Sequence, residues 1–247
     1  MSDFSGQTAV VTGGTRGLGR AIALDLLAHG AHVVATYRSD EDAAAQMKEL
    51  SGEALARLDL ARFDVADAAA VAAFWERLEE QRSDGVQILV NNSGIRRDAA
   101  VALMSEADWR AVLDTNLTGS FLMAKAAVKH MAGRRYGRIV MITSPSARHG
   151  FEGQANYAAS KAGQVAMTRS LAREVAKRKI TVNCVSPGFV DTELLADLSE
   201  EQKAAYRASV PMKRFAEPSE VAYAVRALLA REASYITGSV LEVAGGL

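Results

Sequence analysis

A tyrosine and a lysine lie four residues apart in the segment GQANYAASK, which runs from Gly153 to Lys161. On a helix this spacing places both side chains on one face. The phenol of Tyr157 has an ordinary pKa of about 10, and a fixed ammonium at Lys161 would favour the phenolate and lower that value. The pair therefore predicts a tyrosine that gives or takes a proton near neutral pH. The same spacing also arises by chance on amphipathic helices, so the alternative is a pair without a catalytic role.

A glycine-rich stretch near the start of the chain has the pattern of a dinucleotide-binding loop. The apolar run 7–12 leads directly into GGTRGLG, which opens an amphipathic helix. Glycines at such a turn permit a tight bend, close approach of a pyrophosphate to backbone N–H groups, and close helix packing. The residues of this loop that we expect to bind the cofactor are Gly13, Thr15, Arg16, Gly17, Leu18 and Gly19.

The end of the next strand, 31–37, indicates which dinucleotide is bound. NAD sites usually place an acidic residue there to bind the ribose hydroxyls, whereas this strand ends in Tyr37 and Arg38. An arginine suits a 2′-phosphate, and Arg16 supplies a second positive charge, so we expect NADP(H). In the alternative, Arg38 is an exposed turn residue and one of the acids at 40–42 binds the ribose. Those acids also fit the first turn of a helix.

Polar residues and glycines recur where later strands end. Asp64 and Val65 follow a strand at 56–63, and Asp64 either meets the adenine or simply precedes a helix. The continuous apolar run 86–94, typical of a parallel strand buried on both faces, stops at Asn92 and Gly94. Further strands are predicted at 138–144, 180–188 and 239–245, the second of which ends in Pro187 and Gly188.

Helical patterns separate these strands along the whole chain. The alternation predicts an α/β fold of the Rossmann type, with one doubly wound parallel sheet of about seven strands and helices on both faces. We expect a single domain that spans 1–247. Such sheets bind ligands beyond the carboxyl ends of their strands. The segment from about 190 to 212 has no strand partner and is predicted to be a substrate lid.

One polar residue interrupts the apolar stripe of the helix predicted from 105 to about 131. A buried polar side chain needs hydrogen-bond partners. Asn116 is therefore either structural, at a bent turn, or functional, holding a water molecule. The sequence leaves both interpretations open.

Composition and charge exclude several classes of partner. The 29 basic and 29 acidic residues cancel, so no overall field favours nucleic acid or an anionic membrane. No apolar run approaches the roughly 20 residues that span a bilayer. The four histidines are scattered without a metal-ligand spacing, and the single Cys184 lies in an apolar strand. We therefore expect a soluble cytoplasmic protein without metal, nucleic-acid or membrane partners.

Together the motifs resemble the short-chain dehydrogenase/reductase family over essentially the whole chain. They are TGGTRGLG, NNSG, Asn116, a serine thirteen residues before the tyrosine, the YAASK box and PGFVDT. Ser93 departs from the pattern, because the family usually has alanine there. The resemblance implies a catalytic tetrad of Asn116, Ser144, Tyr157 and Lys161.

The resemblance also implies a role for each member of this tetrad. Tyr157 would give a proton to the substrate carbonyl oxygen as hydride arrives from the nicotinamide, and Ser144 would polarise that oxygen. Lys161 would bind the nicotinamide ribose and lower the pKa of the tyrosine, and Asn116 would hold a relay water. Val190 and Thr192 would fix the nicotinamide carboxamide.

Within the family, the chain is similar to the 3-oxoacyl-[acyl-carrier-protein] reductases, through VNNSGIRRD, GQANYAASKAG, SLAREVAKRKITVN, SPGFVDT and YITGSVLEV. This implies NADPH-dependent reduction of a 3-oxoacyl thioester on acyl carrier protein, in fatty-acid or polyketide-like synthesis. It also implies a homotetramer built through the two long helices and the C-terminal helix and strand. Arg135 and Arg178 match arginines that dock the acidic carrier protein beside the cleft. The alternative is that they complement helix C-termini.

Three other functions deserve comparison. The same chemistry would serve a small ketone, a sugar or a steroid carbonyl. A non-catalytic nucleotide sensor would not need a serine, a tyrosine and a lysine at catalytic spacing. A hydrolase that uses Ser144 and His149 lacks a nucleophile-elbow pattern, since Pro145 follows the serine.

Overall fold

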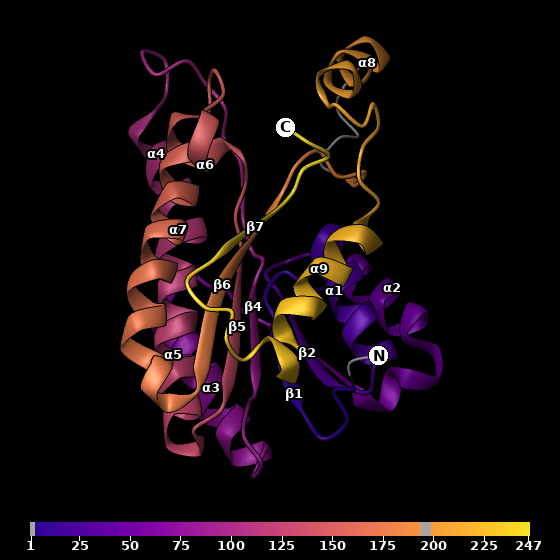
Figure 1. The fold of residues 1–247 in the computed structure, drawn as a ribbon, viewed down its shortest axis with the longest axis vertical. Coiled ribbons are helices and arrows are strands. Elements are labelled where there is room, and N and C mark those ends of the chain that lie inside the picture. The colour runs from indigo at the N-terminus through magenta and orange to yellow at the C-terminus, as the bar shows by residue number, and fades with distance from the viewer. Residues whose placement is uncertain (1–2, 194–198) are drawn as a thin grey trace.

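Seven parallel strands form one sheet in the order β3-β2-β1-β4-β5-β6-β7 (Figure 1). The computed structural model describes residues 3–193 and 199–247. The strands are β1 (Thr8–Val11), β2 (His32–Tyr37), β3 (Leu58–Arg62), β4 (Ile88–Asn91), β5 (Gly137–Ile142), β6 (Ile180–Pro187) and β7 (Val240–Val243). All neighbouring pairs are parallel, so the carboxyl ends of all seven strands share one edge. The predicted doubly wound sheet is confirmed.

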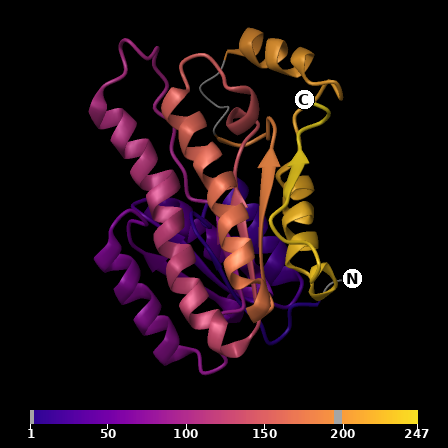
Figure 2. The same cartoon turned by 60° about the vertical axis from the view of Figure 1, so that its left-hand side comes forward.

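Helices cover both faces of this sheet. They are α1 (Gly17–Ala28), α2 (Glu41–Ser51), α3 (Ala68–Gln81), α4 (Glu106–Leu113), α5 (Gly119–Arg134), α6 (Ser146–His149), α7 (Ala155–Val175), α8 (Glu200–Ser209) and α9 (Pro218–Leu229). Short helical turns lie at η1 (Gly52–Arg57), η2 (Asp114–Thr118), η3 (Ala176–Arg178) and η5 (Arg231–Ala233). Helices α1 and α9 pack together on one face, while α3, α5 and α7 pack on the other (Figure 2).

The hydrophobic core has two halves because successive strand residues point to opposite faces. In β1, Ala9 and Val11 pack with α1 and α9, whereas Val10 packs with α3 and α5. The same alternation in β4 sends Ile88 to one half and Leu89 to the other. Burial on both faces explains why these strands are continuously apolar in the sequence.

Two predicted elements differ from the structure in ways that affect the site. The strand predicted over 86–94 ends at Asn91, because NNSG leaves the sheet to bond the loop after β1. The helix predicted from 105 to about 131 is interrupted by the π-helical turn η2 between α4 and α5. The acids at 40–42 begin α2, with the Asp40 carboxylate accepting a hydrogen bond of 2.9 Å from the Ala43 N–H.

Close packing at the glycine turn gives a testable consequence. A Cβ added to Gly19 would lie 2.1 Å from the Gly13 carbonyl oxygen, so we expect Gly19→Ala to lower stability by about 1–3 kcal/mol and weaken dinucleotide binding. Gly133→Ala is the matched control, because no atom lies within 4 Å of its added Cβ. That variant should gain about 0.5–1 kcal/mol. Thermal unfolding and cofactor titration measure both, and equal stabilisation of the two variants would contradict the packing described.

Candidate functional site

The loops after β1 and β4 are locked together at the centre of the sheet edge. The Thr12 hydroxyl oxygen accepts hydrogen bonds from the backbone N–H groups of Asn92 and Ser93, both at 2.9 Å. The Asn92 side chain returns two bonds, to the carbonyl oxygens of Thr12 at 2.9 Å and Gly13 at 3.2 Å. Asn92 is among the residues predicted to bind the cofactor, whereas Thr12 is not, although it is the first residue of TGGTRGLG. This cross-link fixes the glycine loop against NNSG.

The glycine loop has the backbone geometry that a dinucleotide needs. Gly13 and Gly17 have positive φ angles of 62° and 51°, which side chains rarely permit. Thr15 is buried in the loop, while the Arg16 side chain projects into solvent and Leu18 packs against the core. Gly17 then opens α1, so the first free N–H groups of the helix lie in the loop. The geometry fits a pyrophosphate at this helix start.

The segment after β6 folds back onto the same loop. A Cβ added to Gly17 would lie 3.2 Å from the Glu193 carboxylate and 4.0 Å from the Thr192 Cβ. Arg20 also pairs with Glu193 at 3.1 Å. Val190 forms an isolated bridge with Ala216, which anchors the segment. The structure thus brings Thr192 to the glycine loop, two parts of the predicted cofactor site that are far apart in the sequence.

Close backbone contacts also fix the end of β6. Pro187 is the last residue of the strand and is buried, and Gly188 follows it. A Cβ at Gly188 would lie 2.9 Å from the Ala244 Cα, so only glycine fits this crossing. The backbone after β6 is therefore held at the sheet edge where the cofactor residues converge.

The end of β2 carries two exposed guanidinium groups. Arg16 lies 3.7 Å from the Asp40 carboxylate, and Arg38 lies 3.7 Å from that of Asp64. The Tyr37 hydroxyl donates a 2.8 Å hydrogen bond to Glu41, which is the main reason that the pKa of this tyrosine is raised. Both arginines have more than half of their side chain exposed and can reach a bound anion. The arrangement fits a phosphate on the adenosine ribose.

Asp64 and Val65 form the turn after β3. The Asp64 carboxylate accepts a 2.9 Å hydrogen bond from the Ala66 N–H, so the acid also stabilises this turn. Val65 is buried and packs against Gly119, where an added Cβ would lie 2.8 Å from a Val65 methyl group. The β3 loop is thereby held beside the start of α5.

Lys161 is fully buried below the strand ends. Its ammonium donates a 2.7 Å hydrogen bond to the Ile142 carbonyl oxygen, and the Thr143 hydroxyl donates one of 3.1 Å to the Lys161 carbonyl oxygen. Burial lowers the pKa of Lys161 from 10.5 to about 8, opposed by the charge of Cys184. A Cβ at Gly94 would lie 3.6 Å from the ammonium, so the glycine keeps the approach to this amine open. Binding of a ribose hydroxyl by this lysine stays a prediction.

The acidity of Tyr157 differs from the sequence-based expectation. Burial raises the pKa of the phenol, and this effect outweighs the charge of Arg96 and a polar contact with the Ser144 hydroxyl, which both lower it. The Lys161 ammonium lies 5.5 Å from the ring centroid but is bonded to Ile142. The prediction that Lys161 brings the pKa toward neutrality is wrong for the protein without its cofactor, because desolvation dominates.

Asn116 lies in the π-helical turn η2 and is completely buried. Its side chain bonds both backbone groups of Ile95, accepting at 2.8 Å and donating at 3.0 Å, and also donates to the Ser160 hydroxyl at 3.1 Å. Its carbonyl oxygen accepts hydrogen bonds from Ser120 at 2.7 Å and Gln164 at 2.8 Å. Such turns recur at functional sites. Asn116 joins the β4 loop to α7, and its relay water stays a prediction.

A series of hydrogen-bonded polar side chains runs from Ser144 to the loop after β4, and no pattern in the sequence predicts it. The hydroxyls of Ser144 and Ser146 lie 3.1 Å apart, and Ser146 donates to the Gln154 carbonyl oxygen at 3.1 Å. Gln154 donates in turn to the Asp98 carboxylate at 3.1 Å, and Asp98 pairs with Arg96. The last side chain of this series is Arg96, whose guanidinium lies over the Tyr157 ring. These contacts orient the Ser144 hydroxyl.

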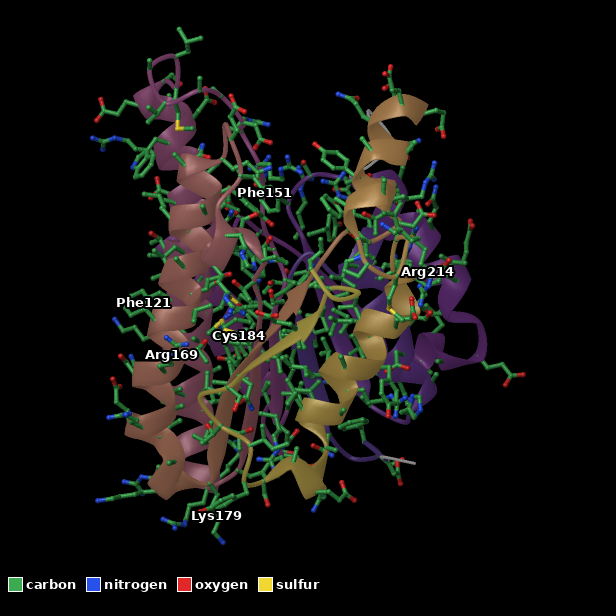
Figure 3. The ribbon with its side chains drawn as sticks, turned by 45° about the horizontal axis from the view of Figure 1, so that its top comes forward. Phe121, Phe151, Arg169, Lys179, Cys184 and Arg214 are labelled. Atoms are coloured by element: carbon green, nitrogen blue, oxygen red, sulfur yellow. The ribbon has the colours of Figure 1, made fainter. Side chains whose placement is uncertain are left out.

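Arg135 and Arg178 lie at the other end of the molecule from the catalytic residues. Arg135 ends α5 just before β5 begins, and Arg178 lies in η3 just before β6 begins. Lys179, next to Arg178, and Phe151, between Ser144 and Tyr157 in the sequence, mark the two ends in Figure 3. Residues that precede parallel strands lie at the amino edge of the sheet, so these arginines do not border the cleft of their own chain, and carrier docking by them stays a prediction.

The predicted lid over 190–212 is described except for residues 194–198, which lie outside the described residues. Helix α8 covers its second half, and Tyr206 stacks on Phe189 with ring centroids 4.7 Å apart. Phe189 also lies 6.5 Å from Phe151, which follows α6. The aromatic contacts place α8 beside the catalytic loop, and the lid function stays a prediction.

The sequence of this chain matches those of known proteins over nearly its whole length. A family model described as enoyl-(acyl carrier protein) reductase matches residues 13–247. The 3-oxoacyl-[acyl-carrier-protein] reductase FabG of Escherichia coli is 42% identical over 245 residues, covering 99% of this chain and 98% of that protein. The chain belongs to the short-chain dehydrogenase/reductase family. Proteins that share the name of the Escherichia coli reductase occur in Salmonella typhimurium and Aquifex aeolicus. They are 43% and 42% identical to this chain over 244 residues, again covering 99% of this chain and 98% of the relative.

A solved structure of this family has nearly the same fold. It is titled a putative gluconate dehydrogenase from Agrobacterium tumefaciens and superposes with a TM-score of 0.94. The two sequences are 34% identical, and the match covers 99% of this chain and 96% of the other.

The described residues contain neither a candidate metal site nor a membrane-spanning helix. Residues 3–193 and 199–247 contain no group of three or more His, Cys, Asp or Glu side chains able to hold a metal ion. Within the same part of the chain, every helix is too short or too polar to cross a membrane.

The buried lysine predicts how stability depends on pH. Because the pKa of Lys161 falls from 10.5 to about 8 on folding, the unfolded chain binds more protons between these values, and wild-type stability should rise with pH there. Relative to wild type, Lys161→Met should therefore lose about 3 kcal/mol of unfolding free energy from about pH 7 to 10.5. Denaturant titrations measure this, with the exposed Lys129→Met as control. A difference that does not change with pH would contradict a buried, charged lysine.

Proposed function

We propose that this chain uses NADPH to reduce the 3-oxo group of a 3-oxoacyl thioester carried on acyl carrier protein, in fatty-acid or polyketide-like synthesis. The observation that carries the proposal is the polar contact of the Ser144 hydroxyl with the Tyr157 phenol, whose ring centroid lies 5.5 Å from the buried ammonium of Lys161. Relatives that are 41–43% identical over nearly their whole length are named for this reaction, which supports the substrate class.

Reduction adds a hydride to the carbonyl carbon and a proton to its oxygen. The bound nicotinamide cofactor supplies the hydride. Tyr157 transfers the proton from its hydroxyl to the oxygen, while the Ser144 hydroxyl donates a hydrogen bond to the same oxygen. Lys161 holds the nicotinamide ribose, and Asn116 holds the water through which the tyrosine regains its proton. Val190 and Thr192 hold the carboxamide.

The raised pKa of Tyr157 suits the reductive direction. A proton donor must carry its proton at the working pH, and burial keeps the phenol protonated near neutrality. Lys161, with a pKa of about 8, is charged at the same pH. The free protein is thus set up with a proton to give and with a cation beside the ribose site.

The cofactor is a nicotinamide dinucleotide, and we assign NADPH from the end of β2. Arg16 and Arg38 provide two exposed guanidinium groups, and Tyr37 stands where an acid would repel a 2′-phosphate. These arginines pair with Asp40 and Asp64, and each would exchange its carboxylate partner for the phosphate. The bond of the Tyr37 hydroxyl to Glu41 keeps that acid turned toward the protein.

We further propose that the chain assembles as a homotetramer through α5, α7, α9 and β7. Phe121 and Arg169 mark the outer face of the α5–α7 layer, and Phe121 is 46% exposed (Figure 3). Ala159 and Ala162 on that face of α7 are exposed and small enough for close helix contact. A second copy packed antiparallel there would bring its Arg135 and Arg178 toward this chain's cleft. Carrier docking would then use arginines of the neighbouring subunit.

Substrate choice is the direct test, because the matching family model is described by an enoyl reduction. We expect NADPH oxidation with a 3-oxoacyl thioester of acyl carrier protein to exceed that with the matched enoyl thioester and with a keto-gluconate, and NADPH to be preferred to NADH. Tyr157→Phe should lower kcat by about 100- to 10,000-fold with little change in NADPH affinity. Preference for the enoyl thioester, or a Tyr157→Phe variant with most of its activity, would overturn the proposal.

Carrier docking has its own test. We expect Arg135→Glu combined with Arg178→Glu to raise KM for the carrier-linked thioester by about tenfold or more, because both charges face an acidic partner. KM for the same acyl group on pantetheine should not change. Lys48→Glu, on an exposed face of α2, is the matched charge control. Equal loss on both substrates, with the oligomeric mass checked by light scattering, would indicate an assembly defect and contradict docking.

A further inference from the structure

Arg96 places a positive charge beside the catalytic tyrosine from outside helix α7. Its guanidinium carbon lies 5.9 Å from the centroid of the Tyr157 ring. The residue belongs to the loop after β4, two positions beyond Gly94, in the stretch VNNSGIRRD, and the sequence analysis assigns it no role. Neither the dinucleotide site nor the proton relay proposed above uses this side chain.

The Arg96 guanidinium is held in one position by its neighbours. It pairs with the Asp98 carboxylate through two nitrogens, and Asp98 also accepts the 3.1 Å hydrogen bond from Gln154 at the start of α7. Only 35% of each side chain of this pair is exposed. Burial is the largest single effect and lowers the pKa of Arg96, but the hydrogen bond and charge of Asp98, with smaller effects of Tyr157 and Tyr206, together outweigh it and raise the pKa. Arg96 therefore carries its charge at every working pH.

The described groups that face the Tyr157 hydroxyl have opposing effects. From the β4 loop, Arg96 favours the phenolate and Asp98 opposes it. From the loop after β5, the Ser144 hydroxyl favours the phenolate, while Lys161 of α7 is bonded to the Ile142 carbonyl oxygen. Tyr206 of α8 acts on Arg96 and is not among the groups that act on Tyr157. Arg96 is thus the strongest charge that offsets the burial of the tyrosine.

We propose that Arg96 is a positioning residue whose fixed positive charge, held by Asp98, tunes how readily Tyr157 transfers its proton. The inference rests on the proposed function, in which Tyr157 is the proton donor. A unit charge about 6 Å away shifts a titration by at most about two pH units at an effective dielectric constant of about 20. Partial exposure and the opposing Asp98 reduce the expected shift to about half to one unit.

The pH profile of the reverse reaction measures this charge. Oxidation of a 3-hydroxyacyl pantetheine thioester by NADP⁺ needs the phenolate, so kcat/KM rises with pH toward the titration midpoint. Arg96→Gln should move the midpoint up by about half to one unit and lower kcat/KM about three- to tenfold below it. Arg96→Lys should keep the wild-type midpoint. Asp98→Asn should shift it the opposite way, which decides the question if Arg96→Gln does not fold.

Arg97→Gln is the matched control for a neighbouring charge. Arg97 is exposed and lies 3.8 Å from Asp108, and it does not act on Tyr157, so its removal should leave the midpoint in place. An unchanged midpoint in folded Arg96→Gln, or an equal shift in Arg96→Lys, would overturn the inference. If the wild type used no 3-oxoacyl thioester, the proposed function would fail, and the same profile on any alcohol that the enzyme oxidises would still test Arg96.

Discussion

The hydrogen bonds that join the loops after β1 and β4 are the constraint on which the site depends. The chain begins at the centre of the sheet, winds outward to β3 and returns to start again at β4, so these two loops diverge at the switch point between the halves. Thr12 and Asn92 tie them together through four hydrogen bonds. The glycine turn, with its free N–H groups, and the opening at Gly94 are consequently fixed relative to each other before any ligand binds.

A second layer of contacts connects this switch point to the catalytic helix. Asn116 clamps Ile95 of the β4 loop and reaches Ser160 of α7, while Thr143 at the end of β5 bonds the Lys161 backbone. Buried networks of this kind are rigid because every lost partner leaves an unsatisfied polar group. The Ser144 and Tyr157 hydroxyls therefore lie just after a strand and on a helix, where a displacement would break several buried bonds at once.

Local sequence patterns predicted the fold and the convergence of the candidate site residues at one edge of the sheet. Continuous apolarity identified the buried strands, and because all strands are parallel, the residues that follow them had to meet at one edge. The π-helical turn could not be foreseen, since it depends on Gln164 and Ser120 binding the carbonyl oxygen of Asn116. Arg96 was missed for the same reason, because its contact with Tyr157 depends on the path of a loop.

The pKa of Tyr157 and the positions of Arg135 and Arg178 depend on the folded structure and could not be read from residue spacing. The pKa of Tyr157 depends on how deeply its hydroxyl is desolvated, which spacing to Lys161 does not reveal. The resemblance to other reductases predicts docking by Arg135 and Arg178, and each precedes a strand and so lies at the amino edge of a parallel sheet. Docking beside a cleft would therefore need the cleft of a neighbouring subunit.

In the proposed reaction, Ser144 and Tyr157 together bind the 3-oxo oxygen of the substrate. The most direct measurement is a crystal structure of the Tyr157→Phe variant with NADPH and a 3-oxoacyl pantetheine thioester, alongside the wild type with NADP⁺ and the same thioester. We expect the 3-oxo oxygen to lie within about 3.2 Å of both hydroxyl oxygens in the wild type and to keep its contact with Ser144 in the variant. A thioester bound with this oxygen beyond reach of Ser144 in both crystals would contradict it.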